Sequence, residues 1–472
     1  MSLSPQKRER LSAFLGELPV AVGLKLFAAL EADRAAGGKG LPHNEILNGL
    51  RRQLVERGAP PQRRPSAKRT FFSPFEDFFI TVRTGKKKRA QIARTSLDPI
   101  WRVMMTDPAL TETAMAAAAL DDAYVAGGDV KALERAMFLA AEAGLGRLVA
   151  RLSENRETRE TLQEELGGEN ALLDLEELRR LIEGVDALKT LRVLVPSHSP
   201  ALTEEQYYDL RQLFLSVYEQ SPSIGASLLL ALKGRLESPW RALGVYYHLA
   251  QSADERLAAA RETVMVLPES LFEDLETMAR ALERAGSEAL DIEAVTARLS
   301  LFSDYADGLA RQASRSGDNV FLNRIEACRD VAAEAHARFV EQALADLRAV
   351  MPVRHAGASS RLVAPRPDFS KLPLPDMVGA AQLAAKFLAA APADARRLGA
   401  DAPLSQATRD DAAGKAKVYA NDLVAEIRAA EGAERAAARR LLDQVLSVIA
   451  PLLESDELGL IRDRAAAAAV TV

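Results

Sequence analysis

The sequence is poor in the residue types that mark disulfide-bonded, metal-binding and sheet-rich proteins. Its 472 residues include one cysteine, Cys328, and five histidines, and aromatic residues make up 5% of the chain. A single cysteine excludes an intramolecular disulfide and a cysteine-based zinc cluster, so nothing in the composition points to an oxidising compartment. We therefore expect a cytoplasmic protein.

Long uncharged hydrophobic runs are also missing. The longest candidates, 221–232 and 444–453, are much shorter than the roughly 18 residues that a membrane-spanning helix needs. Near the N-terminus, Glu17 and Lys25 interrupt an apolar stretch at the spacing of the polar face of an amphipathic helix. This argues against a signal peptide. We expect neither a membrane span nor a cleaved leader.

What the chain does contain favours helix. Hydrophobic residues make up 48% and charged residues 27%, which is the balance of a globular protein. Alanine, leucine, glutamate and arginine are abundant, and these residues lose little conformational freedom in a helix. The excess of arginine and alanine is also typical of GC-rich bacterial genomes. The composition predicts an all-α bacterial protein.

Breaks rich in proline and glycine divide the chain into five expected parts. These are an N-terminal helical lobe (1–58), a basic, Phe-rich linker or arm (59–107), a central helical bundle or array (108–350), a Pro-rich linker (351–375) and a C-terminal Ala-rich helical bundle (376–472). Short loops between the helices predict antiparallel neighbours. Because Ala-rich faces bury little area, we expect the last bundle to favour a homo-oligomer.

Local signals predict several element boundaries. Apolar residues three or four apart predict one helix from Leu172 to Val195, and Thr203 with Gln206 forms a capping-box pattern. Ser96 followed by Pro99 has the pattern of a helix start. The one strand prediction is a short β-hairpin within residues 79–93, around a turn containing Gly85.

No catalytic residue, metal site or cofactor site is predicted. The histidines lack metal-binding spacing, and Cys328 lies within a predicted helix, where a lone cysteine is usually a core residue. The segment Gly37-Gly38-Lys39-Gly40 lacks the leading glycine and the Ser or Thr of a phosphate loop and has the pattern of a helix end. We therefore favour a non-enzymatic scaffold or adaptor that binds other proteins.

The strongest functional signal is an uneven distribution of charge. Residues 51–94 carry thirteen Lys and Arg residues against three carboxylates, a net charge of +10, whereas the rest of the chain carries −15. Such a field attracts phosphate-rich or acidic partners. Ten basic and aromatic residues of this segment are the candidate binding residues: Arg63, Arg64, Lys68, Arg69, Phe71, Phe72, Lys86, Lys87, Lys88 and Arg89.

Four interpretations of the basic segment stay open. Cations with aromatic rings bind single-stranded nucleic acid, and the same combination binds an anionic membrane surface. A third partner is an acidic protein surface, which includes the acidic remainder of the chain itself. The fourth interpretation places the five phenylalanines of 71–79 in the core and leaves the charges solvated. Binding to an anionic surface requires one continuous exposed patch of cations, and pairing with carboxylates would argue against it.

Overall fold

A computed structural model describes residues 11, 14–35, 40–59, 65–81, 83, 87–126, 128–252, 254–285, 291–354 and 365–470. Helices dominate these residues, and two two-stranded sheets accompany them, so the predicted all-α class is confirmed. The chain groups into two compact units, Met1–Arg192 and Val193–Val472. The division into five parts stays a prediction. Gly37, Gly38 and Lys39 of the expected helix end lie outside the described residues.

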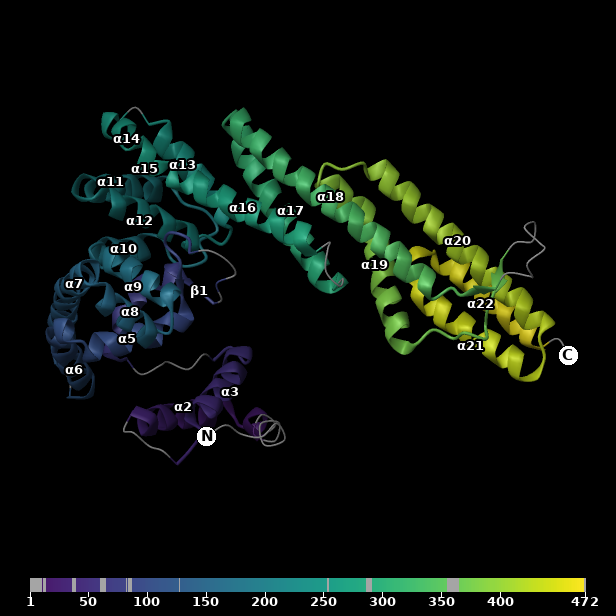
Figure 1. The fold of residues 1–472 in the computed structure, drawn as a ribbon, viewed down its shortest axis with the longest axis horizontal. Helices are drawn as coiled ribbons and strands as arrows, with labels where there is room; N and C mark the ends of the chain where they lie inside the picture. The colour runs from purple at the N-terminus through teal and green to yellow at the C-terminus, as the bar shows by residue number, and fades with distance from the viewer. Residues whose placement is uncertain are drawn as a thin grey trace. The chain divides into compact units, whose positions relative to one another are not determined.

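The first unit contains helices α2 to α10 and one pair of strands (Figure 1). Its elements are α2 (Val20–Ala35), α3 (His43–Glu56), α4 (Ala67–Phe72), the 3-10 helix η1 (Ser73–Phe78), β1 (Phe79–Ile80), β2 (Ile92–Ala93), α5 (Arg94–Thr106), η2 (Pro108–Leu110), α6 (Thr111–Ala126), α7 (Val130–Glu154), α8 (Arg156–Leu166), α9 (Glu169–Ile182) and α10 (Val185–Leu194).

Two sets of helices form the cores of this unit. The α2 and α3 helices bury a leucine-rich cluster around Phe27, Leu47 and Leu50. Farther along the chain, α6 and α7 pack along each other, and α9 contacts α5, α7 and β2. Leu172, Leu175, Leu178 and Ile182 of α9 recur at helical spacing and are buried, so they define the face that this helix packs against the core.

The first strand pair lies where the hairpin was predicted, but that prediction was wrong in topology. Phe79 pairs with Ile92 and Ile80 with Ala93 in parallel. Parallel strands cannot be joined by a tight turn and need a crossover of about a dozen residues. The connecting segment contacts α9 before the chain returns to β2. The parallel pairing rules out a hairpin, and Gly85 of the expected turn lies outside the described residues.

Two predicted helix boundaries were also wrong. The helix expected from Leu172 to Val195 is interrupted between α9 and α10, where Gly184 follows Glu183. Glycine is a weak helix former, and it allows the chain to bend there. The predicted start at Ser96 falls inside α5, which begins at Arg94. The Ser96 hydroxyl contacts a side chain of α9 instead of capping the helix.

The second unit contains sixteen elements among its described residues (Figure 1). They are α11 (Glu204–Gln220), α12 (Pro222–Arg235), η3 (Pro239–Arg241), α13 (Ala242–Ala250), α14 (Glu255–Ala259), α15 (Arg261–Val264), α16 (Val266–Ala285), α17 (Ile292–Arg315), α18 (Asn319–Ala349), β3 (Val353–Arg354), β4 (Arg366–Pro367), α19 (Pro375–Arg397), α20 (Ala402–Ala429), α21 (Gly432–Ile449), η4 (Ala450–Leu452) and α22 (Ser455–Val470).

Long helices pack side by side through this unit. The α18 helix contacts α16, α17 and α19, and α20 contacts α19, α21 and α22. The capping box at the start of α11 is confirmed, because Thr203 and Gln206 bond each other's backbone. Within the predicted Pro-rich linker, β3 and β4 pair antiparallel. Among the described residues, none of the helices combines the length and apolar character that crossing a membrane requires.

A buried histidine lies where α18 meets α19. His336 is 3% exposed, its ring lies 5.6 Å from that of Phe387, and its Nε2 has no hydrogen-bond partner among the described residues. Burial disfavours the charged imidazolium and lowers the pKa of His336 from 6.5 to about 4. The folded chain therefore holds this side chain neutral under conditions in which the unfolded chain protonates it.

We predict that His336 makes the protein sensitive to acid. Because the unfolded chain binds the proton first, the free energy of unfolding decreases as the pH falls from about 6.5 to about 4. The loss amounts to roughly 3 kcal/mol. Urea denaturation at pH 7 and pH 4.5 tests this, with a His336→Leu variant that cannot titrate. Equal losses of stability in the wild type and the variant would contradict the assignment.

Candidate functional site

The candidate binding residues fall into two groups. Lys68, Arg69, Phe71 and Phe72 belong to α4, whereas Lys87, Lys88 and Arg89 precede β2. Arg63, Arg64 and Lys86 lie outside the described residues. The two groups have different surroundings, since the second is held against α9 and part of the first borders an open groove.

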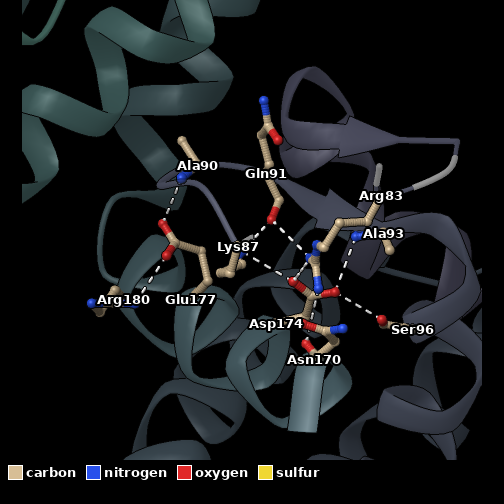
Figure 2. Close-up of polar contacts among 10 residues, drawn as sticks. All are labelled: Arg83, Lys87, Ala90, Gln91, Ala93, Ser96, Asn170, Asp174, Glu177 and Arg180. Carbon is tan, nitrogen blue, oxygen red and sulfur yellow. Dashed lines mark hydrogen bonds and ion pairs between the residues drawn. The ribbon is translucent and has the colours of Figure 1, made fainter. Parts of the chain in front are cut away.

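Lys87 of the second group is held by one carboxylate, Asp174 of α9 (Figure 2). The Asp174 side chain is completely buried. Arg83 forms an ion pair with it, and the Lys87 ammonium lies 3.0 Å from Oδ1. The Ala93 amide and the Ser96 hydroxyl donate to Oδ2 over 3.1 and 2.7 Å. A buried carboxylate is tolerated only with such compensation.

Glu177, one turn farther along α9, holds the same segment at a second point. Its side chain accepts a hydrogen bond from the Ala90 amide over 3.0 Å and one from Arg180 over 2.9 Å (Figure 2). Ala90 has a φ of 54°, a left-handed conformation that costs a residue with a Cβ about 1 kcal/mol or more. The contact with Glu177 stabilises the chain in this unfavourable conformation.

The Lys87 side chain is directed inward. Its ammonium also donates to the carbonyl oxygen of Gln91. Burial lowers the pKa of Lys87, while the nearby Asp174 opposes that shift. Lys88 is half-buried and Arg89 is exposed, and both make contacts of their own. The described basic residues of this group are therefore largely engaged with the chain's own polar groups.

The phenylalanines near these cations form a core. Phe71, Phe72, Phe75 and Phe78 are buried, and Phe79 is half-buried. The Phe71 ring lies 5.5 Å from that of Phe138 and 5.7 Å from that of Trp101. Phe71 is therefore a core residue, and Phe72, which is 6% exposed, offers little surface to bases or lipid although it lines the groove described below.

The first group borders a groove in the first unit. This groove has a volume of about 1170 Å³, and Lys68, Arg69 and Phe72 are among its lining residues. Residues of α2, η1, β1, α5, α6 and α10 complete the lining. It brings together side chains that are far apart in the sequence, from Glu31 to Arg192.

The groove lining carries equal numbers of positive and negative side chains. Its cations are Arg34, Lys68, Arg69, Arg94 and Arg192, and its carboxylates are Glu31, Glu76, Asp98, Asp121 and Asp122. The apolar part of the lining includes Phe72, Phe79, Leu97, Tyr124 and Val125. The formal charge of this lining is therefore zero, in contrast to the +10 of residues 51–94.

Each cation of the lining lies within ion-pair distance of a carboxylate. Arg34 and Arg69 each pair with Glu31, at 3.8 and 2.9 Å, and Lys68 pairs with Asp98. Arg94 pairs with Glu76, and Arg192 lies 3.5 Å from Asp77. All five cations of the lining thus have a carboxylate neighbour, although Arg34 and Arg69 share Glu31 and the partner of Arg192, Asp77, is not a lining residue. The groove therefore attracts polyanions less than the sequence suggested.

The described residues contain no metal-binding cluster. No group of three or more His, Cys, Asp or Glu side chains there is placed to hold a metal ion. The polar side chains around Asp174 bond one another and the backbone, and none of them lines the groove. They serve to anchor the segment between β1 and β2.

Comparison with known proteins gives no functional lead. No family model matches the chain, and neither the curated proteins nor the solved structures include a significant match. The function has to be argued from the structure of this chain alone.

Sequence reasoning missed the carboxylates that organise the site. Neither Asp174 nor Glu177 was among the candidate residues, because carboxylates in a helix rich in charged residues are usually solvated. A local signal was available, since Asp174 lies three residues after Ala171 and four before Leu178, on the apolar face. A carboxylate in that position indicates a buried partner, although the sequence does not identify Arg83 or Lys87 as that partner.

We predict that Asp174→Asn strongly destabilises the first unit. The substitution leaves Arg83 and Lys87 without their charged partner, and breaking a buried ion pair costs about 3 to 5 kcal/mol. Trypsin should then cut faster after Arg83, Lys87, Lys88 or Arg89, because local opening exposes these sites. The measurements are urea denaturation and timed proteolysis followed by mass spectrometry.

The matched control is Asp98→Asn, which removes the same charge from the pair with Lys68. Asp98 is 81% exposed, so its pair contributes at most about 1 kcal/mol. If the two variants were equally stable and equally resistant to trypsin at these four sites, Asp174 would not be the anchor described above.

Proposed function

We propose that the protein is a non-enzymatic helical adaptor that binds another protein in the groove of its first unit. The observation that supports this most is the balanced charge of a groove that also contains aromatic and aliphatic side chains. Protein interfaces combine apolar contacts with a polar rim, and Arg and Tyr are frequent among their strongest contacts.

The size of the groove also favours a protein segment. About 1170 Å³ exceeds the usual upper limit of roughly 1,000 Å³ for small-molecule pockets. Val125 is 69% exposed at its edge, so an apolar side chain is available to a partner without rearrangement of the core. A peptide or a surface loop would use both features.

Binding to an anionic membrane or nucleic acid is the weaker alternative. That alternative needs several unpaired cations on one surface, because phosphate contacts supply most of the affinity. Lys68, Arg69 and Lys87 have carboxylate partners, and Phe71 and Phe72 are buried. These contacts argue for a protein partner instead.

The proposal keeps two expectations from the sequence. The single cysteine and the composition favour the bacterial cytoplasm. Self-association through the Ala-rich helices α19 to α22 stays a prediction, to be measured by the oligomeric state of the full chain.

We predict that Val125→Glu abolishes capture of the partner. A charge at this position would be buried against the partner's apolar side chain, and an unpaired buried charge is costly. The measurement is quantitative mass spectrometry of proteins captured from native lysate treated with nuclease. We expect at least a tenfold loss, equivalent to about 1.4 kcal/mol.

Met115→Glu is the control for this experiment. Met115 lies on the same helix and is also 69% exposed, but it does not line the groove. Loss of one protein from the Val125→Glu sample alone supports the proposal. Identical sets of captured proteins from the wild type and both variants would reject the groove as the binding site.

A further inference from the structure

The part of the groove that α6 lines, called here its α6 end, differs from the rest of the lining in its charge. Asp121 and Asp122 lie within the last two turns of α6 and are both exposed. The C-terminal end of a helix carries a partial negative charge from its unbonded carbonyl groups. The last turn of α6 contains no basic residue to offset it. Side chains and backbone therefore combine to make this end of the groove negative.

The two aspartates keep their charge available. Whereas each cation of the lining pairs with a carboxylate, Asp121 and Asp122 form no ion pair with any described residue. Asp121 accepts one hydrogen bond, from the Ala67 amide over 2.7 Å. Ala67 is the first residue of α4, and the partial positive charge of that helix N-terminus offsets part of the charge of Asp121, whereas Asp122 has no such contact among the described residues.

An apolar side chain lies on the same face of α6. Val125 follows Asp122 by three residues and Asp121 by four, a spacing that places all three side chains next to one another. All three line the groove, as does Tyr124. This end of the groove thus presents an apolar contact directly beside two carboxylates that lack cationic partners.

We propose that the groove accepts a basic amphipathic segment of the partner protein. An aliphatic side chain of that segment packs against Val125, and a Lys or Arg near it pairs with Asp121 and Asp122. The inference rests on the proposed adaptor function and specifies the chemistry of the partner. It reverses the expectation from the sequence, in which the protein supplied the positive charge.

The test uses a defined probe, a fluorescently labelled helix-forming peptide of leucine and lysine. A peptide with the same leucine positions and glutamate in place of lysine reports the importance of charge. Both are titrated into the wild type, an Asp121→Asn/Asp122→Asn variant and a Glu164→Gln/Glu165→Gln variant, and binding is followed by fluorescence anisotropy.

The glutamate variant is the matched control. Glu164 and Glu165 are adjacent and exposed on α8 of the same unit, and they form no ion pair with any described residue. Its loss of two charges equals that of the aspartate variant. A general attraction between a basic peptide and an acidic protein would therefore weaken equally in both.

We expect the Leu/Lys peptide to bind the wild type and the glutamate variant alike, and the aspartate variant about five to ten times more weakly. The Leu/Glu peptide should not bind. Equal affinities for the two variants, or preferential binding of the Leu/Glu peptide or of single-stranded DNA, would overturn the inference.

The outcome is separable from that of the adaptor proposal. If Val125→Glu loses the captured protein but Asp121→Asn/Asp122→Asn retains it fully, the groove binds a protein whose contacts do not include a basic residue at this end. If neither variant affects capture, the adaptor proposal itself fails.

Discussion

Asp174, a completely buried carboxylate, determines the direction in which the nearby Arg83 and Lys87 side chains point. A carboxylate without water must be compensated by cations and hydrogen-bond donors, and the segment between β1 and β2 supplies both. Arg83 and Lys87 therefore turn toward α9 instead of solvent. Because Ala93 and Ser96 are held by the same carboxylate, the start of α5 is fixed as well. Ala93, whose amide donates to Asp174, also pairs with Ile80 in the parallel strands β1 and β2.

The contacts of Asp174 change the functional interpretation of the basic segment, residues 51–94. Charge and aromatic content alone suggest a binding arm, but the phenylalanines of α4 and η1 belong to the core and several cations belong to ion pairs. The surface that we propose for binding is a groove whose lining has balanced charge and whose α6 part carries two aspartates without ion pairs. A protein partner suits that surface better than a phosphate-rich one.

The sequence predicts the helical class well, because helix formation depends on local periodicity and capping. The α18 helix and the capping box of α11 follow from residues close together in the chain. The predictions that were wrong concern features that depend on contacts between residues far apart in the sequence. Arg83 and Asp174 are separated by 91 residues, and no local pattern links them. The helix breaks at Gly184, before α10. Whether a single glycine interrupts a strong helical pattern depends on the surrounding contacts, which the local sequence does not show.

The same distinction applies to the groove. Lys68, Arg69 and Phe72 were recognised as candidates, whereas Asp121, Asp122 and Val125 were not, since no local sequence pattern connects α4 with the end of α6.

Photo-crosslinking in living cells tests the central claim most directly, with a benzophenone amino acid at position 125 or, as a reference, at position 115. The account predicts a covalent adduct with one protein from position 125 only. Equal adducts from both positions, or an adduct from 125 that nuclease removes, would contradict it.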